Sequence, residues 1–189
     1  MSKPRLLGLS GSLRRDSANT LILQTLRDTL AGRAEIELFP LDAIPLYNQD
    51  LDTEAAPQAV GALRQAIASA DGVIVASPEY NHGMSGVLKN ALDWASRPYA
   101  RSALIGKPVL TLTSSPAFTG GVRAHQQLNE TLTAITARLV LRPQTVVGAV
   151  HEKISEGRLA DPATLAFLTA AVEHLIADIG ERPALRAAA

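Results

Sequence analysis

The stretch with the clearest chemical potential is residues 8–19, which reads Gly-Leu-Ser-Gly-Ser-Leu-Arg-Arg-Asp-Ser-Ala-Asn. It follows a short apolar run and precedes a helical pattern that begins at Thr20. The N–H groups that open a helix lack partners within it, and the helix dipole adds partial positive charge there. Serine hydroxyls and the guanidinium of Arg14 or Arg15 would add donors to a phosphate. The stretch therefore predicts a phosphate-binding loop; the alternative is an ordinary strand-to-helix turn capped by Ser17 or Asn19.

A second stretch, residues 77–94, begins Ser-Pro-Glu-Tyr-Asn-His-Gly directly after an apolar run. Tyr80 is able to cover a planar ligand, and Glu79 and Asn81 would present polar groups to its edge. Gly83 is expected to adopt a backbone angle that other residues avoid. The alternative is a loop whose tyrosine packs inward and whose Ser85 only caps the following helix.

A third stretch, residues 114–121, ends in Gly120-Gly121 before another helical pattern. Paired glycines would expose backbone N–H groups to a ligand, and Phe118 offers a wall for a flat ring. A plain turn with Gly120 in the left-handed conformation is the alternative.

These stretches are set within an alternation of apolar runs and helical patterns. We predict strands at residues 5–10, 35–41, 72–77, 108–114 and 139–147, the last interrupted by Pro143, and helices at residues 19–30, 56–70, 85–96, 121–137 and 162–179. Five strand–helix units predict an α/β fold, a parallel sheet with helices on both faces. Since ligands bind beyond the carboxyl ends of such strands, the three stretches are expected to form one site.

The first loop differs from the common nucleotide-binding motifs. Gly8 and Gly11 are separated by two residues, so the dinucleotide pattern Gly-x-Gly-x-x-Gly is absent, and no Gly-Lys-Ser/Thr follows as in a Walker A loop. A loop rich in hydroxyls and without lysine better suits a terminal monophosphate, such as that of FMN.

Several motifs together resemble the NADPH-dependent FMN reductase family, which includes bacterial quinone, chromate and azo-dye reductases. They are Gly-Ser-Leu-Arg-x-x-Ser-x-Asn at 11–19, Leu-Tyr-Asn-Gln-Asp-Leu at 46–51, Pro-Glu-Tyr-Asn-His-Gly at 78–83, Leu-Lys-Asn-Ala-Leu-Asp-Trp at 88–94 and Gly-Gly-x-Arg at 120–123. The resemblance spans about residues 5–150. It implies a flavodoxin-like fold, with a five-stranded parallel sheet in the order 2-1-3-4-5.

The resemblance also implies cofactor-binding roles. The phosphate loop corresponds to Ser10, Ser12, Arg14, Ser17 and Asn19, the segment along the flavin ring and ribityl chain to Pro78, Glu79, Tyr80 and Asn81, and the opposite flank to Ser114, Gly120 and Gly121. Tyr47, Phe118 and Arg123 are candidates for the substrate pocket. Family members commonly have glycine after the Ser-Pro of the third loop, where this chain has Ala117.

No constellation of side chains in the sequence suggests chemistry without a cofactor. The four histidines are scattered, no Gly-x-Ser-x-Gly nucleophile motif occurs, and no metal site is expected. FMN would therefore carry the reaction, taking reducing equivalents from NADPH or NADH and passing them to a small acceptor such as a quinone, chromate, an azo compound or free flavin. Because both substrates would use one exposed face, ping-pong kinetics are expected.

Composition limits the other classes of function. Lysine plus arginine and aspartate plus glutamate number 18 each, so no net field attracts nucleic acid. The absence of cysteine excludes disulfides, thiolate metal sites and iron–sulfur clusters. The apolar run that ends at Gly8 is too short for a signal peptide or a membrane span, so we expect a cytoplasmic protein without a membrane partner.

We expect one domain over residues 1–189, with a frayed tail at 183–189. The family implies a homodimer or homotetramer, formed near the irregular segment 42–52 and the third helix. Three other functions remain as alternatives: the flavin reductase component of a two-component monooxygenase, a flavodoxin-like electron carrier, and a non-redox module that binds a phosphorylated ligand. The neutral charge disfavours a carrier, since such proteins are usually acidic.

Overall fold

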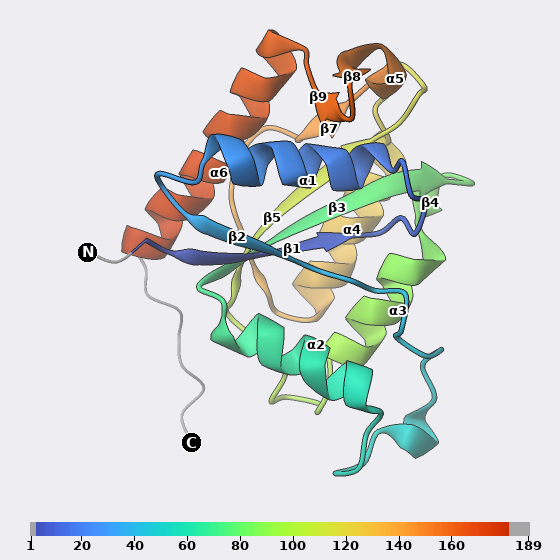
Figure 1. The fold of residues 1–189 in the computed structure, drawn as a ribbon. Helices are drawn as coiled ribbons and strands as arrows, with labels where there is room; N and C mark the ends of the chain where they lie inside the picture. Colours follow the sequence, from blue (N-terminus) through green and yellow to red (C-terminus); the bar gives the residue numbers. More distant parts are fainter. Residues whose placement is uncertain (1–2, 182–189) are drawn as a thin grey trace.

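A mainly parallel sheet forms the middle layer of the molecule (Figure 1). The computed structural model describes residues 3–181. The strands of this sheet are β1 (Arg5–Ser10), β2 (Glu35–Phe39), β3 (Gly72–Tyr80), β4 (Gly83–Met84), β5 (Pro108–Ser114), β6 (Arg138–Leu139) and β7 (Val146–Val147). The order is β2-β1-β3-β5-β6, with β7 also beside β5. All pairings within it are parallel except that of β3 with β4.

Helices cover both faces of the sheet. They are α1 (Ala18–Thr29), α2 (Gln58–Ser69), α3 (Gly86–Ala95), α4 (Val122–Ala134) and α6 (Pro162–Glu181), with shorter pieces η1 (Gln49–Leu51) and α5 (Val150–Lys153) and a small hairpin of β8 (Ile154–Ser155) and β9 (Arg158–Leu159). The side chains of β3 alternate between the two cores: Ile74 packs with α1 and α6, and Val73 and Val75 pack with the helices of the other face. The continuous apolar run of this strand is therefore explained by helices on both sides.

The expected fold class is confirmed. The observed order is the flavodoxin-like 2-1-3-4-5 arrangement, with β5 as the fourth strand. The fifth strand differs in detail, because the prediction of one strand over 139–147 was wrong. Two pairs of residues, in β6 and β7, take its place on either side of Pro143, whose missing N–H cannot join a sheet ladder. The segment 148–161 with α5, β8 and β9 was not predicted, and the expected tail at 183–189 lies outside the described residues.

The end of β3 also differs from the expectation of a loop after Ser77. The strand continues to Tyr80 and turns back into β4 through Asn81 and His82, which both have positive φ, 49° and 65°. Two such residues between antiparallel strands are typical of a tight hairpin turn. The unusual angle expected at Gly83 is thus at the two preceding residues. A side chain at Gly83 would instead meet Oε1 of Gln127, since a Cβ there would lie 2.8 Å from it.

Among the described residues, α6 is the one helix long and apolar enough by composition to cross a membrane. Its buried residues Leu168, Val172 and Leu175 belong to the core between the sheet and α1. Its apolar composition therefore has a structural explanation in the packing of this core.

Candidate functional site

A cleft of about 360 Å³ opens at the carboxyl edge of the sheet, beyond the ends of β1, β3 and β5. We call it the carboxyl-edge cleft. It is lined by Ser12, Arg14, Asp16, Ser17, Ala18, Asn19, Leu21, Pro78, Glu79, Tyr80, Ser114, Ser115, Pro116, Val150, His151 and Ile154. The three stretches singled out in the sequence thus meet around one space, as parallel strands require.

The start of α1 forms one wall of the cleft. Ser17 caps the helix: its Oγ accepts a hydrogen bond from the N–H of Thr20 at 3.3 Å, and its side chain also borders the cleft. Asn19 is 3% exposed, and its Oδ1 has no hydrogen-bond partner within residues 3–181. Since a buried polar atom usually has a partner, this atom indicates a place for a ligand.

Ser10 and Gly11 hold the loop that precedes α1. The hydroxyls of Ser10 and Thr20 lie 2.7 Å apart, and the N–H of Gly11 donates to the carbonyl of Ala76 on β3. A Cβ at Gly11 would lie 2.6 Å from Oγ of Ser85, so only glycine fits there without a shift. Ser10 therefore supports the loop and does not line the cleft.

The end of β3 is connected to α4 through Glu79. One carboxylate oxygen accepts hydrogen bonds from the N–H groups of Arg123 and Ala124, at 3.0 and 3.1 Å, and the guanidinium of Arg123 lies 3.8 Å from the other. The N-cap residue of α4, Gly121, has φ of 87° and no side chain with which to cap the helix. Glu79 thus supplies the cap, and its negative charge is favourable beside this helix N-terminus.

The loop after β5 forms the opposite wall. Ser114 is 2% exposed, and its Oγ lacks a hydrogen-bond partner in the part of the chain that the structure describes. Gly120, with φ of 66°, packs against the backbone of Val147 and Gly148, where a Cβ would approach to 2.9 Å. Its carbonyl accepts a hydrogen bond from Oγ1 of Thr113. Gly120 therefore lies behind this wall, where it allows the backbone of Val147 and Gly148 to approach closely.

A fourth wall was missed by the sequence analysis. The N–H of Ala149 donates to the carbonyl of Ala117, and that of Val150 to the carbonyl of Ser115. These bonds bring Val150, His151 and Ile154 to the cleft. Their position just after the last strand could have indicated this wall, because the residues that follow a strand of a parallel sheet lie at its carboxyl edge.

Eight of the predicted cofactor-binding residues line the cleft: Ser12, Arg14, Ser17, Asn19, Pro78, Glu79, Tyr80 and Ser114. The others, Ser10, Asn81, Gly120 and Gly121, lie behind the cleft wall or in the adjoining turn. The three substrate-pocket candidates are also outside the lining. Tyr47 packs edge-on against Trp94 with ring centroids 4.9 Å apart, Phe118 is 91% exposed, and Arg123 pairs with Glu79.

The residues of the cleft fit FMN. A helix N-terminus, two hydroxyls and Arg14 would face a phosphate, and Tyr80, which is 49% exposed, offers an aromatic surface at the mouth. Among the described residues both Asn19 Oδ1 and Ser114 Oγ lack a partner; Asn19 Oδ1 would accept a hydrogen bond from a hydroxyl of such a ligand, and Ser114 Oγ would donate or accept one. Within residues 3–181, no group of three or more His, Cys, Asp or Glu side chains is placed to hold a metal ion.

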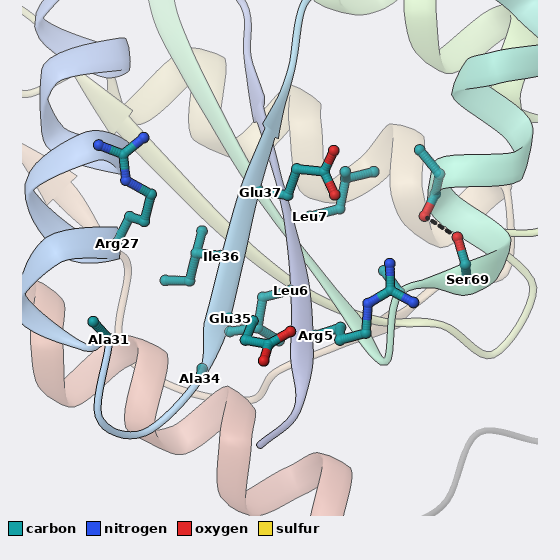
Figure 2. A pocket seen from close by; sticks show the side chains of 12 residues that line it. Arg5, Leu6, Leu7, Arg27, Ala31, Ala34, Glu35, Ile36, Glu37 and Ser69 are labelled. Carbon is teal, nitrogen blue, oxygen red and sulfur yellow. Dashed lines mark hydrogen bonds between the residues drawn. The ribbon is translucent and has the colours of Figure 1, made fainter. Parts of the chain in front are cut away.

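A second hollow, of about 350 Å³, lies at the opposite edge of the sheet (Figure 2). We call it the amino-edge hollow. Figure 2 shows Arg5 and Glu35 on the neighbouring strands β1 and β2, where the two residues are paired in register. Arg27 of α1 and Ser69 of α2 approach from the two sides, and the hydroxyl of Ser69 donates to carbonyls of its own helix.

Comparison with known proteins agrees with this geometry. A family model described as NADPH-dependent FMN reductase matches residues 4–152. An NAD(P)H-dependent FMN reductase of Pseudomonas aeruginosa is 39% identical, over 83% of this chain and 85% of that protein. A quinone reductase of Escherichia coli is 38% identical, over 88% of this chain and 90% of that protein. Among solved structures, FerB, a flavoenzyme NAD(P)H:(acceptor) oxidoreductase from Paracoccus denitrificans, has a TM-score of 0.86 and 31% identity, covering 94% of this chain and 98% of FerB.

Proposed function

Because the chain belongs to the NADPH-dependent FMN reductase family, we propose that it is an NAD(P)H oxidoreductase that holds FMN in the carboxyl-edge cleft and reduces a quinone. Two buried polar atoms that have no partner among the described residues, Asn19 Oδ1 and Ser114 Oγ, carry the proposal, since they belong to residues on opposite walls of one cleft. The whole of residues 1–189 would serve as a single FMN-binding domain in the cytoplasm.

The start of α1 would hold the phosphate of FMN. The residues for this role are Ser12, Arg14, Ser17 and Asn19, with the N–H groups of the first helical turn; Asn19 would contribute N–H donors, because its Oδ1 only accepts hydrogen bonds. Arg14 would add a charge-assisted hydrogen bond, which is stronger than a neutral one. Ser10 would keep the loop in place through its contact with Thr20.

The ring and ribityl chain would lie between the end of β3 and the loop after β5. Pro78, Tyr80 and Ser114 would contact them directly. Glu79, Gly120 and Gly121 would position these walls, and Asn81 would place Tyr80 through the hairpin turn. When bound, FMN supplies the redox chemistry, accepting a hydride from a reduced nicotinamide and passing two electrons to the acceptor.

Exposed side chains beside the cleft would receive the nicotinamide and the acceptor in turn. Phe118 and Arg123 belong to the loop and helix that Glu79 connects to β3, and both are largely open to solvent. Phe118 would offer a flat apolar surface to a quinone, and Arg123 a positive charge to the phosphates of the dinucleotide.

We also propose that the protein forms a homodimer or homotetramer through the segment 42–52 and the region around α3. Leu46 and Tyr99 are 84% and 83% exposed there. Tyr47, which packs against Trp94 and Arg97, has a buried hydroxyl without a hydrogen-bond partner in residues 3–181. A partner subunit at this place would cover the apolar side chains and supply the missing contact. Sedimentation of the wild type and of Leu46→Asp tests this, because a shift to monomer is expected only for an interface residue.

The function is tested by the visible spectrum of the protein loaded with FMN, followed without oxygen. Addition of NADPH or NADH is expected to bleach the flavin absorbance, and a substoichiometric quinone to restore part of it. Initial rates at several quinone concentrations should give parallel double-reciprocal lines. A protein that binds no FMN, or whose flavin is not reduced by either nicotinamide, would contradict the proposal.

A further inference from the structure

His151 has no role in the function proposed above, although it lines the carboxyl-edge cleft together with Arg14 and Ser17. Its side chain is 60% exposed, so it is open to a ligand that enters the cleft. Its neighbour Glu152, whose carboxylate lies 3.7 Å from Nε2, is 72% exposed, and such a surface pair is weak enough to yield to another partner.

The backbone of His151 is held in place on both sides. Val150 is 3% exposed in the core, and its N–H donates to the carbonyl of Ser115 at 3.1 Å. Ile154, three residues later at the start of β8, packs against the same core. The imidazole is therefore presented to the cleft from a fixed position, so binding costs little backbone ordering.

The hairpin that follows His151 packs beside α1. The N–H of Leu159, in the second strand of this hairpin, donates to Oγ1 of Thr25 in the second half of α1, and Leu26 and Leu159 share one core cluster. Leu21 and Ile154 border the cleft from these two segments. His151 thus lines the same cleft as Ser17 and Asn19, at the helix N-terminus where the phosphate is proposed to bind.

Besides His151, the charged residues that line the cleft are Arg14, Asp16 and Glu79. Arg14 and Asp16 are of opposite sign, and the carboxylate of Glu79 is directed to the N-terminus of α4 and to Arg123. An imidazole offers an N–H donor in either protonation state, which suits a phosphate oxygen. We propose that His151 donates a hydrogen bond to the phosphate of FMN, in addition to the donors of the loop before α1 and of the first turn of this helix. This inference rests on the proposed placement of the phosphate.

Binding of FMN and of riboflavin to His151→Ala tests the proposal, because riboflavin lacks the phosphate. FMN is expected to bind about 5–20-fold more weakly than to the wild type, whereas the affinity for riboflavin should change less than about twofold. His151→Gln, which retains an N–H donor, should recover part of the loss. The phosphorus-31 resonance of bound FMN should also shift in His151→Ala.

Two controls separate this inference from the placement on which it rests. His174→Ala removes an exposed histidine of α6 outside the cleft and should leave both affinities unchanged. Arg14→Ala should weaken FMN binding selectively; if it does and His151→Ala does not, the role of His151 is wrong and the phosphate placement stands. If neither variant discriminates FMN from riboflavin, the placement itself fails. An equal loss for both ligands in His151→Ala, or a raised KM for NADPH with unchanged FMN affinity, would also overturn the role proposed for His151.

Discussion

The carboxyl-edge cleft and the amino-edge hollow have nearly the same volume, about 360 and 350 Å³, but different chemistry. The cleft contains the first turn of α1 and two buried polar atoms without partners among the described residues. The hollow contains the last turns of α1 and α2 near Arg27 and Ser69, together with Glu35 and Glu37. Volume alone therefore does not identify a binding site in this protein.

The difference follows from the direction of the strands. In a parallel sheet every crossover helix begins at the carboxyl edge and ends at the amino edge, so partial positive charge gathers at one edge and partial negative charge at the other. The helix ends therefore favour an anionic ligand in the cleft. In the hollow, Glu35 and Glu37 are balanced by Arg5 and Arg27, so the contrast between the two edges rests on the direction of the helices and not on the charge of the side chains.

Among the substitutions that test the contrast between the two edges, Gly148→Ala is expected to have the largest effect on stability and FMN binding. The added methyl group would collide with the carbonyl oxygen of Phe118 and force apart two backbone segments of the cleft wall. We expect a loss of about 2–4 kcal/mol in the free energy of unfolding, measured with urea, and loss of FMN binding. Gly32→Ala, near the hollow, has open space around its Cβ and should change stability by less than about 0.5 kcal/mol. Equal stability of the two variants would contradict the close approach described at Gly148.

The next largest effect is expected from Arg14→Ala in the cleft, compared with Arg27→Ala in the hollow. Loss of a charge-assisted hydrogen bond should weaken FMN binding about 10–100-fold, or about 1.5–3 kcal/mol. Among residues 3–181, Arg27 forms a surface ion pair with Asp28, and its removal should leave the affinity unchanged. Quenching of FMN fluorescence on binding measures the affinity of each variant. A comparable loss of affinity in both would contradict the proposal that FMN binds at the carboxyl edge and not at the amino edge.

Glu79→Ala tests how much the connection between β3 and α4 contributes to stability. The variant removes a carboxylate that is 11% exposed and accepts two N–H groups of α4, so we expect a loss of about 1–2 kcal/mol of stability. Lys89→Ala removes an exposed pair with Asp93 on α3 and should cost less than about 0.5 kcal/mol. Thermal unfolding of the two proteins without FMN gives the comparison; a Glu79 variant as stable as the Lys89 variant would show that the cap contributes little.

The smallest effect is on the pH dependence of stability, and it arises from His125, a buried residue of α4. The hydroxyl of Thr111 donates to Oδ1 of Asn129, the amide of Asn129 donates to Nδ1 of His125, and Nε2–H of His125 donates back to Thr111. This ring of bonds requires a neutral imidazole, and burial lowers the pKa of His125 below its ordinary value of 6.5. The unfolded chain therefore takes up this proton first as the pH falls, and stability is lost progressively below about pH 6.5.

His125→Gln should flatten this dependence, with a difference in melting temperature of roughly 2–4 °C between pH 7 and pH 5 relative to the wild type. The exposed His174→Gln should retain the wild-type profile. If the profile of His125→Gln coincides with that of the wild type, the buried ring does not contribute to acid sensitivity.

The sequence was sufficient for the central sheet and for much of the cleft. The apolar runs at 6–9, 73–76 and 109–112 are long enough to mark buried parallel strands, and polar residues directly after them mark the carboxyl edge. Ser17 and Ser85 were both recognisable as helix caps, and both accept the expected hydrogen bond.

The remaining features depend on contacts between distant residues. In the place of the fifth strand, β6 and β7 pair only two residues each with β5, too few to show a repeating pattern of apolar residues in the sequence. The turn at Asn81 and His82 adopts left-handed backbone angles without glycine. The cap that Glu79 provides joins residues 44 positions apart, which no local pattern encodes. His151 reaches the cleft only because Ala149 and Val150 bond to the loop after β5.

A crystal structure of the protein with FMN decides between the two edges, because it locates the ligand at one of them. We expect the phosphate at the N-terminus of α1 beside Ser17 and Arg14, the ring between Tyr80 and the loop after β5, and no flavin in the amino-edge hollow. FMN bound between Arg5, Arg27 and Glu35, or a phosphate distant from α1, would contradict it.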